Sequence, residues 1–142
     1  MTADQTDPTE TLRALMPFAA TLGIEVLRYD PQEVRVRLTW APGLCTAGGA
    51  IHGGAVMTLA DTAGGACAYL NLPPGAAGTT TVESKTNFLR AVRDGYIEAV
   101  ARPLHTGRTL TVVETDVRDT RQRLAARVTQ SQLVLAGQET RP

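Results

Sequence analysis

The sequence is poor in the residue types that build disulfide frameworks and metal centres. Only two cysteines and two histidines occur among its 142 residues. Cys45 and Cys67 alone do not make the framework of a disulfide-rich domain, and no HxH, HExxH or zinc-ligand spacing is present. We therefore expect no metal site and no cofactor.

The sequence also lacks an excess of charge and a long apolar run. Its 14 basic and 14 acidic side chains give a formal net charge of zero, so no overall field attracts nucleic acid or an anionic membrane. No apolar run approaches the ~18 residues of a membrane-spanning helix, and no charged segment followed by an apolar one marks a secretion signal. We expect a cytoplasmic protein that binds neither nucleic acid nor membrane.

No change of composition divides the chain, and 43% of its residues are hydrophobic. Residues 1–142 are therefore predicted to form a single domain. Residues 1–22 form an N-terminal helical flank in this prediction, because Asp7 can cap a helix that begins with Pro8. Pro17 is expected to kink or split that flank.

The most informative stretch is Gly48–Leu70, with the sequence GGAIHGGAVMTLADTAGGACAYL. From Ala55 onward its apolar residues recur at helical spacing, which predicts a helix of about five turns that begins at Gly53-Gly54. A second row of small residues, including Gly64 and Gly65, lies beside the apolar row and surrounds Asp61. Such a row admits another backbone or a ligand at close range.

His52 and Asp61 are the two candidate chemical groups of this stretch. Exposed N–H groups at the helix start, beside glycines without a Cβ, can polarise a carbonyl oxygen, and Asp61 needs a partner, water or a function. A structural role is the alternative for both residues. Nine residues put Asp61 about half a turn around the helix from His52 and ~13 Å along it. If both act on one substrate, the second group must come from another copy, in a two-fold dimer with composite sites.

The remaining sequence predicts an antiparallel sheet. Asp94-Gly95 is a strong hairpin signal, and turn signals also occur at 105–107 and 119–122. Consecutive hairpins predict a meander, so one long helix between early and late strands indicates an α+β fold in which the sheet wraps the helix. The predicted strands are 24–28, 34–40, 78–89, 96–102, 109–118 and 124–135.

The run Gly49-x-x-His52-Gly53-Gly54, followed by Leu59-Ala60-Asp61 and later by Asn87-Phe88-Leu89-Arg90, resembles the hotdog-fold acyl-CoA thioesterases. Within them it is most similar to the group of PaaI, the thioesterase of phenylacetic acid degradation. The resemblance spans about Gly23 to Leu135, nearly the whole chain. It implies an α+β hotdog fold, an antiparallel sheet wrapped around one long central helix.

The resemblance also implies catalytic roles. The Gly53 amide would polarise the thioester carbonyl, His52 would support that loop, and Asp61 of the partner subunit would be the nucleophile or the general base. Thr46 stands where the family often carries Asn, six positions before the histidine. Its hydroxyl has fewer hydrogen-bonding groups than a carboxamide, but it can still orient water or the carboxylate.

Substrate contacts are predicted at six positions. Gly54 and Gly65 leave room for a ligand. The resemblance implies that the beginning of the hydroxyl-rich strand approaches the site, so that Thr79 or Thr80 contacts the acyl group or water; a solvated strand face is the alternative. Arg90 and Arg108 are the candidates for the phosphates of coenzyme A, because arginine forms bidentate, charge-assisted bonds with phosphate. A solvated loop arginine is the alternative for each.

The predicted reaction is hydrolysis of an acyl-CoA thioester to a carboxylate and free CoA, so that coenzyme A is part of the substrate. Aryl-acetyl and medium-chain acyl groups both remain open. The expected assembly is a homodimer with composite sites, paired into a homotetramer. Two alternatives remain: a hotdog enoyl-thioester hydratase or dehydratase, and a non-catalytic acyl-CoA-binding sensor.

Overall fold

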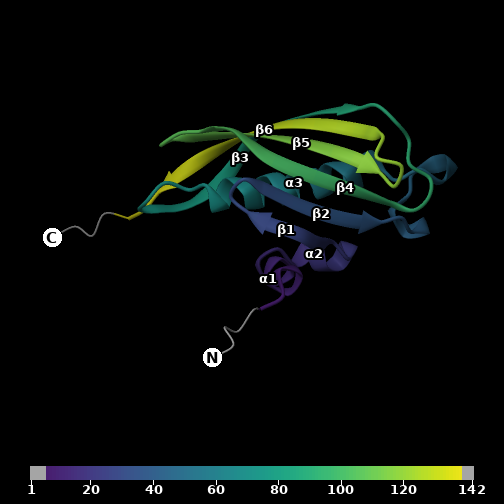
Figure 1. Ribbon diagram of the computed structural model, residues 1–142, viewed down its shortest axis with the longest axis horizontal. Coiled ribbons are helices and arrows are strands. Elements are labelled where there is room, and N and C mark those ends of the chain that lie inside the picture. Colours follow the sequence, from purple (N-terminus) through teal and green to yellow (C-terminus); the bar gives the residue numbers. More distant parts are fainter. Residues whose placement is uncertain (1–5, 139–142) are drawn as a thin grey trace.

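The computed structural model of the chain describes residues 6–138. A six-stranded antiparallel sheet in the order β1-β2-β4-β5-β6-β3 packs on one long helix, α3, as Figure 1 shows. This is the α+β architecture expected from the sequence. The helices are α1 (Pro8–Leu15), α2 (Pro17–Leu22) and α3 (Gly53–Leu70), and the strands are β1 (Glu25–Asp30), β2 (Glu33–Thr39), β3 (Ala76–Phe88), β4 (Tyr96–Thr106), β5 (Leu110–Asp119) and β6 (Leu124–Ala136).

Helix α3 begins at Gly53 and spans 18 residues, as predicted. Its apolar row faces the sheet, where Leu59, Ala60, Ala63 and Cys67 are fully buried. Small side chains predominate in this row, so the helix axis lies close to strands β2, β4 and β5. The rest of the core comes from the inward face of the strands, such as Val36 in β2.

The N-terminal flank forms two short helices, as the proline pattern predicts. The Asp7 side chain accepts a hydrogen bond from the Thr9 backbone N–H and caps α1. The helix ends before Pro17, and α2 starts with that proline and ends at Gly23, whose φ of 73° closes it. Helix α1 packs against β1 and leaves the junction at Met16 facing α3.

The meander is confirmed only for β4, β5 and β6. The predicted hairpin at Asp94-Gly95 is wrong, because β3 pairs with β6 and β4 pairs with β2. Gly95 does turn the chain, with a φ of 67°, but its carbonyl accepts from the Trp40 backbone N–H (2.8 Å). The turn therefore attaches β4 to β2, and residues 89–95 carry the chain away from β3.

Strand β3 is consequently an edge of the sheet. Its 13 residues bond to β6 on one side, and their other side faces away from the sheet within the described chain. The hydroxyl-rich sequence of this strand suits an edge, where its side chains can meet solvent or a partner sheet. An edge of this length is a template for pairing with another strand.

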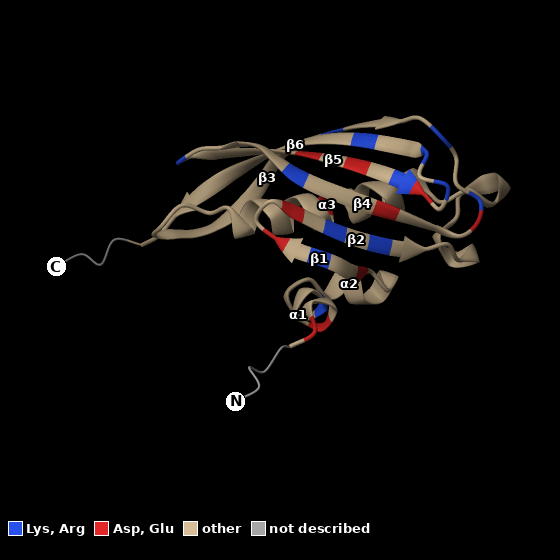
Figure 2. Cartoon of the chain, viewed as in Figure 1, with Lys and Arg blue, Asp and Glu red and all other residues tan. Residues whose placement is uncertain are grey.

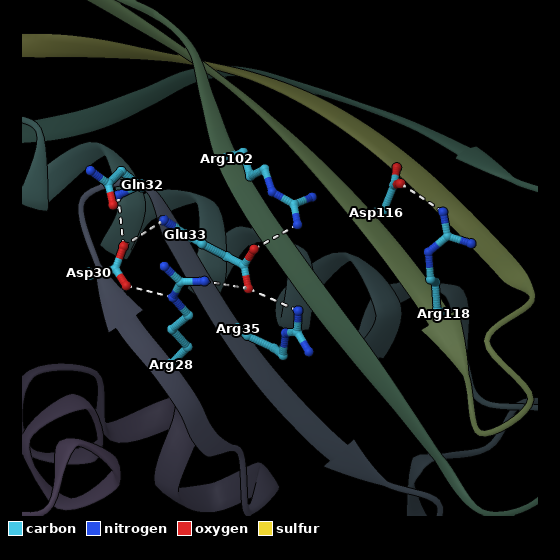
Figure 3. A network of polar contacts seen from close by, with 8 residues as sticks. All are labelled: Arg28, Asp30, Gln32, Glu33, Arg35, Arg102, Asp116 and Arg118. Atoms are coloured by element: carbon cyan, nitrogen blue, oxygen red, sulfur yellow. Dashed lines mark hydrogen bonds and ion pairs between the residues drawn. The ribbon is translucent and has the colours of Figure 1, made fainter.

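Charged side chains on the outer face of the sheet form ion pairs, and Figure 2 marks the acidic and basic positions along the strands in red and blue. The buried Glu33 carboxylate accepts from Arg35 (2.9 Å) and Arg102 (2.6 Å), and Arg28 lies 3.7 Å from it, as Figure 3 shows. Asp116 is paired in the same way with Arg118 and Arg127. The hydrogen bond from Arg127 is the main cause that lowers the pKa of Asp116.

Residues 6–138 contain neither a membrane-spanning helix nor a metal-binding cluster. None of the helices there has both the length and the apolar character needed to cross a membrane. Within the same residues no group of three or more His, Cys, Asp or Glu side chains is placed to hold a metal ion.

Candidate active site

Asp61 lies at a cavity of about 470 Å³ between α3, the first half of β3 and the α1–α2 junction. Three residues predicted to contact substrate, Gly65, Thr79 and Thr80, line the same cavity. Its apolar wall includes Leu15 and other large side chains. The structure thus brings the candidate carboxylate together with three of its predicted neighbours.

The Asp61 carboxylate is held by an amide group from β6 and a hydroxyl group from β3. The Gln130 Nε2 group donates to Asp61 Oδ1, and the Thr81 hydroxyl lies 3.4 Å from the same oxygen. Gln132 Nε2 donates to Thr81 Oγ1 (2.6 Å). Asp61 Oδ2 has no hydrogen-bond donor among residues 6–138. One carboxylate oxygen is thus fixed, and the other is left available.

Sequence reasoning missed Gln130, Gln132 and Thr81. One signal was present in the sequence. Every second residue of β6 faces inward, and the two glutamines follow the apolar Ala126 and Val128 in this inward row. Amides at inward positions of a strand are uncommon, because a buried amide must find a hydrogen-bond partner.

The loop before α3 is fixed by its neighbours. Gly48 and Gly49 have φ values of 79° and 73°, which side chains with a Cβ rarely adopt. The Trp40 Nε1 group donates to the Gly49 carbonyl (3.0 Å), and Arg93 Nε donates to the Gly48 carbonyl (3.3 Å). The start of α3 is therefore held in one orientation.

His52 is the N-cap of α3. Its Nδ1 atom accepts from the Gly54 backbone N–H (2.8 Å), so Nδ1 carries no proton in this arrangement. The Gly53 N–H makes no hydrogen bond within residues 6–138. A Cβ on Gly53 would lie 3.2 Å from two atoms of the Phe88 ring, so glycine leaves room at the helix start. An open N–H here lies at the positive end of the helix macrodipole.

Gly53 lines a second cavity, of about 420 Å³, together with Thr46, Phe88 and Arg90. No lining residue of this cavity also lines the Asp61 cavity. Along α3, the eight residues from Gly53 to Asp61 correspond to about 12 Å. Within one chain the predicted catalytic residues therefore fall into two separate places.

A third cavity, of about 290 Å³, adjoins the second, since both include Arg90. Its other arginines are Arg93, Arg121 and Arg123, and the last two come from the β5–β6 turn. Sequence reasoning missed Arg121 and Arg123, because the pairing of distant strands brings them beside Arg90. We name this group the arginine cleft.

Asp119 also lines the arginine cleft, but its charge is already engaged. Arg123 donates to its carboxylate (2.8 Å), and the backbone N–H groups of Arg121 and Arg123 donate to it as well (2.9 Å each). Burial by itself raises the pKa of Asp119, but these hydrogen bonds outweigh it, so the pKa is lowered. Asp119 thus fixes the turn, and Arg90 and Arg121 have no ion-pair partner among residues 6–138.

Arg108 is not brought to these residues. It lies in the β4–β5 turn, which is at the other end of β5 from Arg121, and it lines none of the three cavities. The Cys67 thiol is also no candidate, because burial raises its pKa to about 11. Asp61 therefore remains the candidate nucleophile or base of this region.

Comparison with known proteins places this geometry in a family. Residues 48–126 match the model of the thioesterase superfamily. A thioesterase of Haemophilus influenzae, HI1161, is 26% identical with a TM-score of 0.85, and the alignment covers 100% of each chain. A thioesterase family protein of Silicibacter pomeroyi is 30% identical with a TM-score of 0.83, over 91% of this chain and 96% of that one.

The PaaI protein of the Escherichia coli phenylacetic acid degradation operon is 22% identical, with a TM-score of 0.82 and coverage of 90% of this chain and 91% of that one. This likeness shows the fold alone, so the finer PaaI-like assignment made from the sequence is not established. The matched segment contains His52, Gly53 and Asp61 and covers more than half of the chain. The chain therefore belongs to the thioesterase superfamily, as a hydrolase with the hotdog fold.

Proposed function

We propose that the protein hydrolyses an acyl-CoA thioester to a carboxylate and free CoA, with Asp61 as the nucleophile or the general base. One observation carries this proposal: Asp61 lines a cavity of about 470 Å³, and its Oδ2 atom has no donor in the part of the chain that the structure describes. A carboxylate held by one oxygen suits attack on a carbonyl carbon or activation of water.

The second catalytic group comes from a partner subunit in this proposal. Strand β3 offers an open edge of 13 residues, with Thr79 and Thr80 at its beginning and Phe88 at its end. If two copies pair antiparallel along this edge, the beginning of one β3 lies beside the end of the other. The Asp61 cavity of one protomer then meets the Gly53 cavity of its partner. A further pairing of two dimers into a tetramer remains a prediction.

The proposed chemistry follows from these positions. The Gly53 N–H of the partner subunit donates to the thioester oxygen, and negative charge develops there as the carbonyl carbon becomes tetrahedral. Removing one such donor costs about 3 kcal/mol in comparable enzymes. Asp61 adds to the carbon directly or takes a proton from the attacking water. If water attacks, the C–S bond breaks and the proton held by Asp61 passes to the CoA thiolate. If Asp61 attacks, breaking of the C–S bond leaves a mixed anhydride and the CoA thiolate, and water then hydrolyses the anhydride to the free acid, restores Asp61 and supplies the proton of the thiol.

In this proposal, different parts of the substrate occupy different cavities. The apolar wall of the Asp61 cavity, with Leu15, Tyr29 and Tyr69, suits an aryl-acetyl or medium-chain acyl group. The Gly53 cavity is mostly apolar and suits the pantetheine arm. The arginine cleft beside it suits the phosphates of CoA through Arg90 and Arg121. Thr46, Gly54 and Arg108 keep their predicted roles only as proposals.

Release of free thiol from a panel of acyl-CoA esters tests this proposal. We expect turnover with aryl-acetyl or medium-chain esters and none with the Asp61→Asn variant. Hydration of an enoyl-CoA without thiol release would instead support a hydratase. Tight binding of acyl-CoA by the wild type without any product would support a sensor.

A further inference from the structure

We propose that Gln130 is a positioning residue, whose side-chain amide holds the Asp61 carboxylate by Oδ1 and leaves Oδ2 as the reacting oxygen. This inference rests on the proposed function of Asp61. Gln132 and Thr81 complete the arrangement from the adjoining positions. None of these three residues carries out chemistry itself.

The two glutamines stand out against the rest of β6. Gln130 and Gln132 are each only 1% exposed, in the same inward row as Ala126 and Val128. Burial of an amide costs free energy unless its polar atoms find partners. The Gln130 Oε1 atom is buried and has no hydrogen-bond partner within residues 6–138. A valine at this position would fit the pattern of the strand without that cost, so the amide needs another explanation.

The orientation of the Gln130 amide supplies the explanation. Its Nε2 group donates to Asp61 Oδ1, while Oε1 points at Gly64 of α3. Exchange of the two amide atoms would set Oε1 against the ionised carboxylate, which repels it. A Cβ on Gly64 would overlap Oε1, so this glycine provides the room that the amide occupies. The absence of a side chain at Gly64 in α3 thus allows Gln130 of β6 to form its hydrogen bond with Asp61.

Gln132 orients the second donor. Its Nε2 group donates to Thr81 Oγ1 (2.6 Å), and its Oε1 accepts from the Thr79 hydroxyl (3.2 Å). Since Thr81 Oγ1 receives this donor, its own proton is available to Asp61 Oδ1 at 3.4 Å. Both donors therefore reach the same carboxylate oxygen. Asp61 Oδ2 has no donor within residues 6–138, and Asp61 lines the cavity.

The Gln130→Met variant tests the proposal, because methionine keeps the length of the side chain and removes the donor. We expect kcat to fall about 10-fold to 100-fold, the range for loss of one hydrogen bond to a charged group. KM should stay within about twofold. The melting temperature should hold or rise, since the variant also removes an unpartnered buried oxygen. A purely structural glutamine would give the reverse, with lower stability and unchanged kcat.

Two comparisons keep the result unambiguous. Ser131→Ala, on the outer face of β6 between the two glutamines, should change neither kcat nor the melting temperature. In the Asp61→Ala background, Gln130→Met should lower the residual rate no further, because the carboxylate that Gln130 holds is already absent. If Gln130→Met keeps full kcat while Asp61→Asn is inactive, the inference on Gln130 is overturned and the proposed function stands. If Asp61→Asn retains turnover, the proposed function itself fails.

Discussion

Two polar clusters on opposite faces of the sheet differ in how completely they are paired. On the outer face, Glu33 has arginine donors on both carboxylate oxygens, and its side chain is 7% exposed. On the inner face, the donors to Asp61 from residues 6–138 all bond to Oδ1, and the nearby buried Gln130 Oε1 has no partner in that same part of the chain. A cluster with every group paired stabilises the sheet. A cluster left incomplete beside a cavity is suited to bind and react.

The largest expected effect concerns the incomplete cluster. Asp61→Ala should lower kcat for acyl-CoA hydrolysis by about 100-fold to 10,000-fold, the contribution typical of an acid or base that acts on the reacting atoms. The free energy of unfolding should change little, because Asp61 is exposed in the chain. Steady-state thiol release and thermal unfolding measure the two quantities. Unchanged kcat would remove Asp61 from the mechanism.

For the fully paired cluster around Glu33 we expect the reverse, a loss of stability without a loss of activity. Glu33→Gln should lower the free energy of unfolding by about 1–3 kcal/mol, because the charge-assisted hydrogen bonds from Arg35 and Arg102 and the ion pair with Arg28 are weakened. This loss of stability is at or below the lower end of the range for breaking a buried ion pair, because the arginine side chains can turn to solvent. Hydrolysis should keep its kcat. Denaturant titration measures the free energy of unfolding. A loss of kcat in Glu33→Gln as large as that in Asp61→Ala would contradict the purely structural role of the Glu33 cluster.

Gly64→Ala tests how the helix supports the incomplete cluster. The added methyl group displaces the Gln130 side chain, whose far end can rotate away, so the hydrogen bond to Asp61 is lost. We expect kcat to fall about tenfold. The unfolding free energy should change by less than about 1 kcal/mol, because alanine favours the helix. Gly65→Ala is not a suitable control, as Gly65 lines the cavity. Ala68→Ser, on the buried side of α3, should spare kcat.

Two arginines, one paired and one without an ion-pair partner among residues 6–138, differ in the same way, with a smaller expected effect. Arg127 is paired with Asp116 (2.8 Å), whereas Arg121 has no ion-pair partner among residues 6–138. Arg121→Ala should raise KM for an acyl-CoA about twofold to fivefold, the effect of an exposed charge pair. KM for the matching N-acetylcysteamine thioester, which has no phosphates, should not change. Arg127→Ala serves as the control, and an equal rise for both thioesters would exclude phosphate binding.

The fold could be predicted in most parts because its signals are local. Helical periodicity located α3 at Gly53, and Asp7 and Pro17 located the flanking helices. The predicted hairpin at Asp94-Gly95 failed, because a turn residue fixes the backbone locally and does not determine which strand becomes the neighbour. Pairing of β3 with β6 joins residues about 40 to 60 positions apart, and no short pattern carries that information.

The candidate site could be predicted only in part, for a related reason. Asp61, Gly65, Thr79 and Thr80 belong to recognisable segments, and the structure gathers them at one cavity. Gln130 contacts Asp61 of α3, and Arg121 lies at the same cavity as Arg90, so both placements depend on how distant segments pack in the fold. Arg108 and Arg90 looked equivalent in sequence, yet the fold places them in different regions.

Complementation between two inactive variants tests the composite site most directly. Gly53→Pro removes the candidate N–H at a position where proline suits a helix start, and His52, with φ of −60° and ψ of 136°, already has the backbone that precedes proline. Gly53→Ala is its control, as it adds a Cβ and keeps the N–H. Co-expressed with Asp61→Asn at equal levels, Gly53→Pro should yield mixed dimers with one intact site each, and about a quarter of wild-type activity. Mixed dimers that stay as inactive as either variant alone would contradict a site shared between subunits.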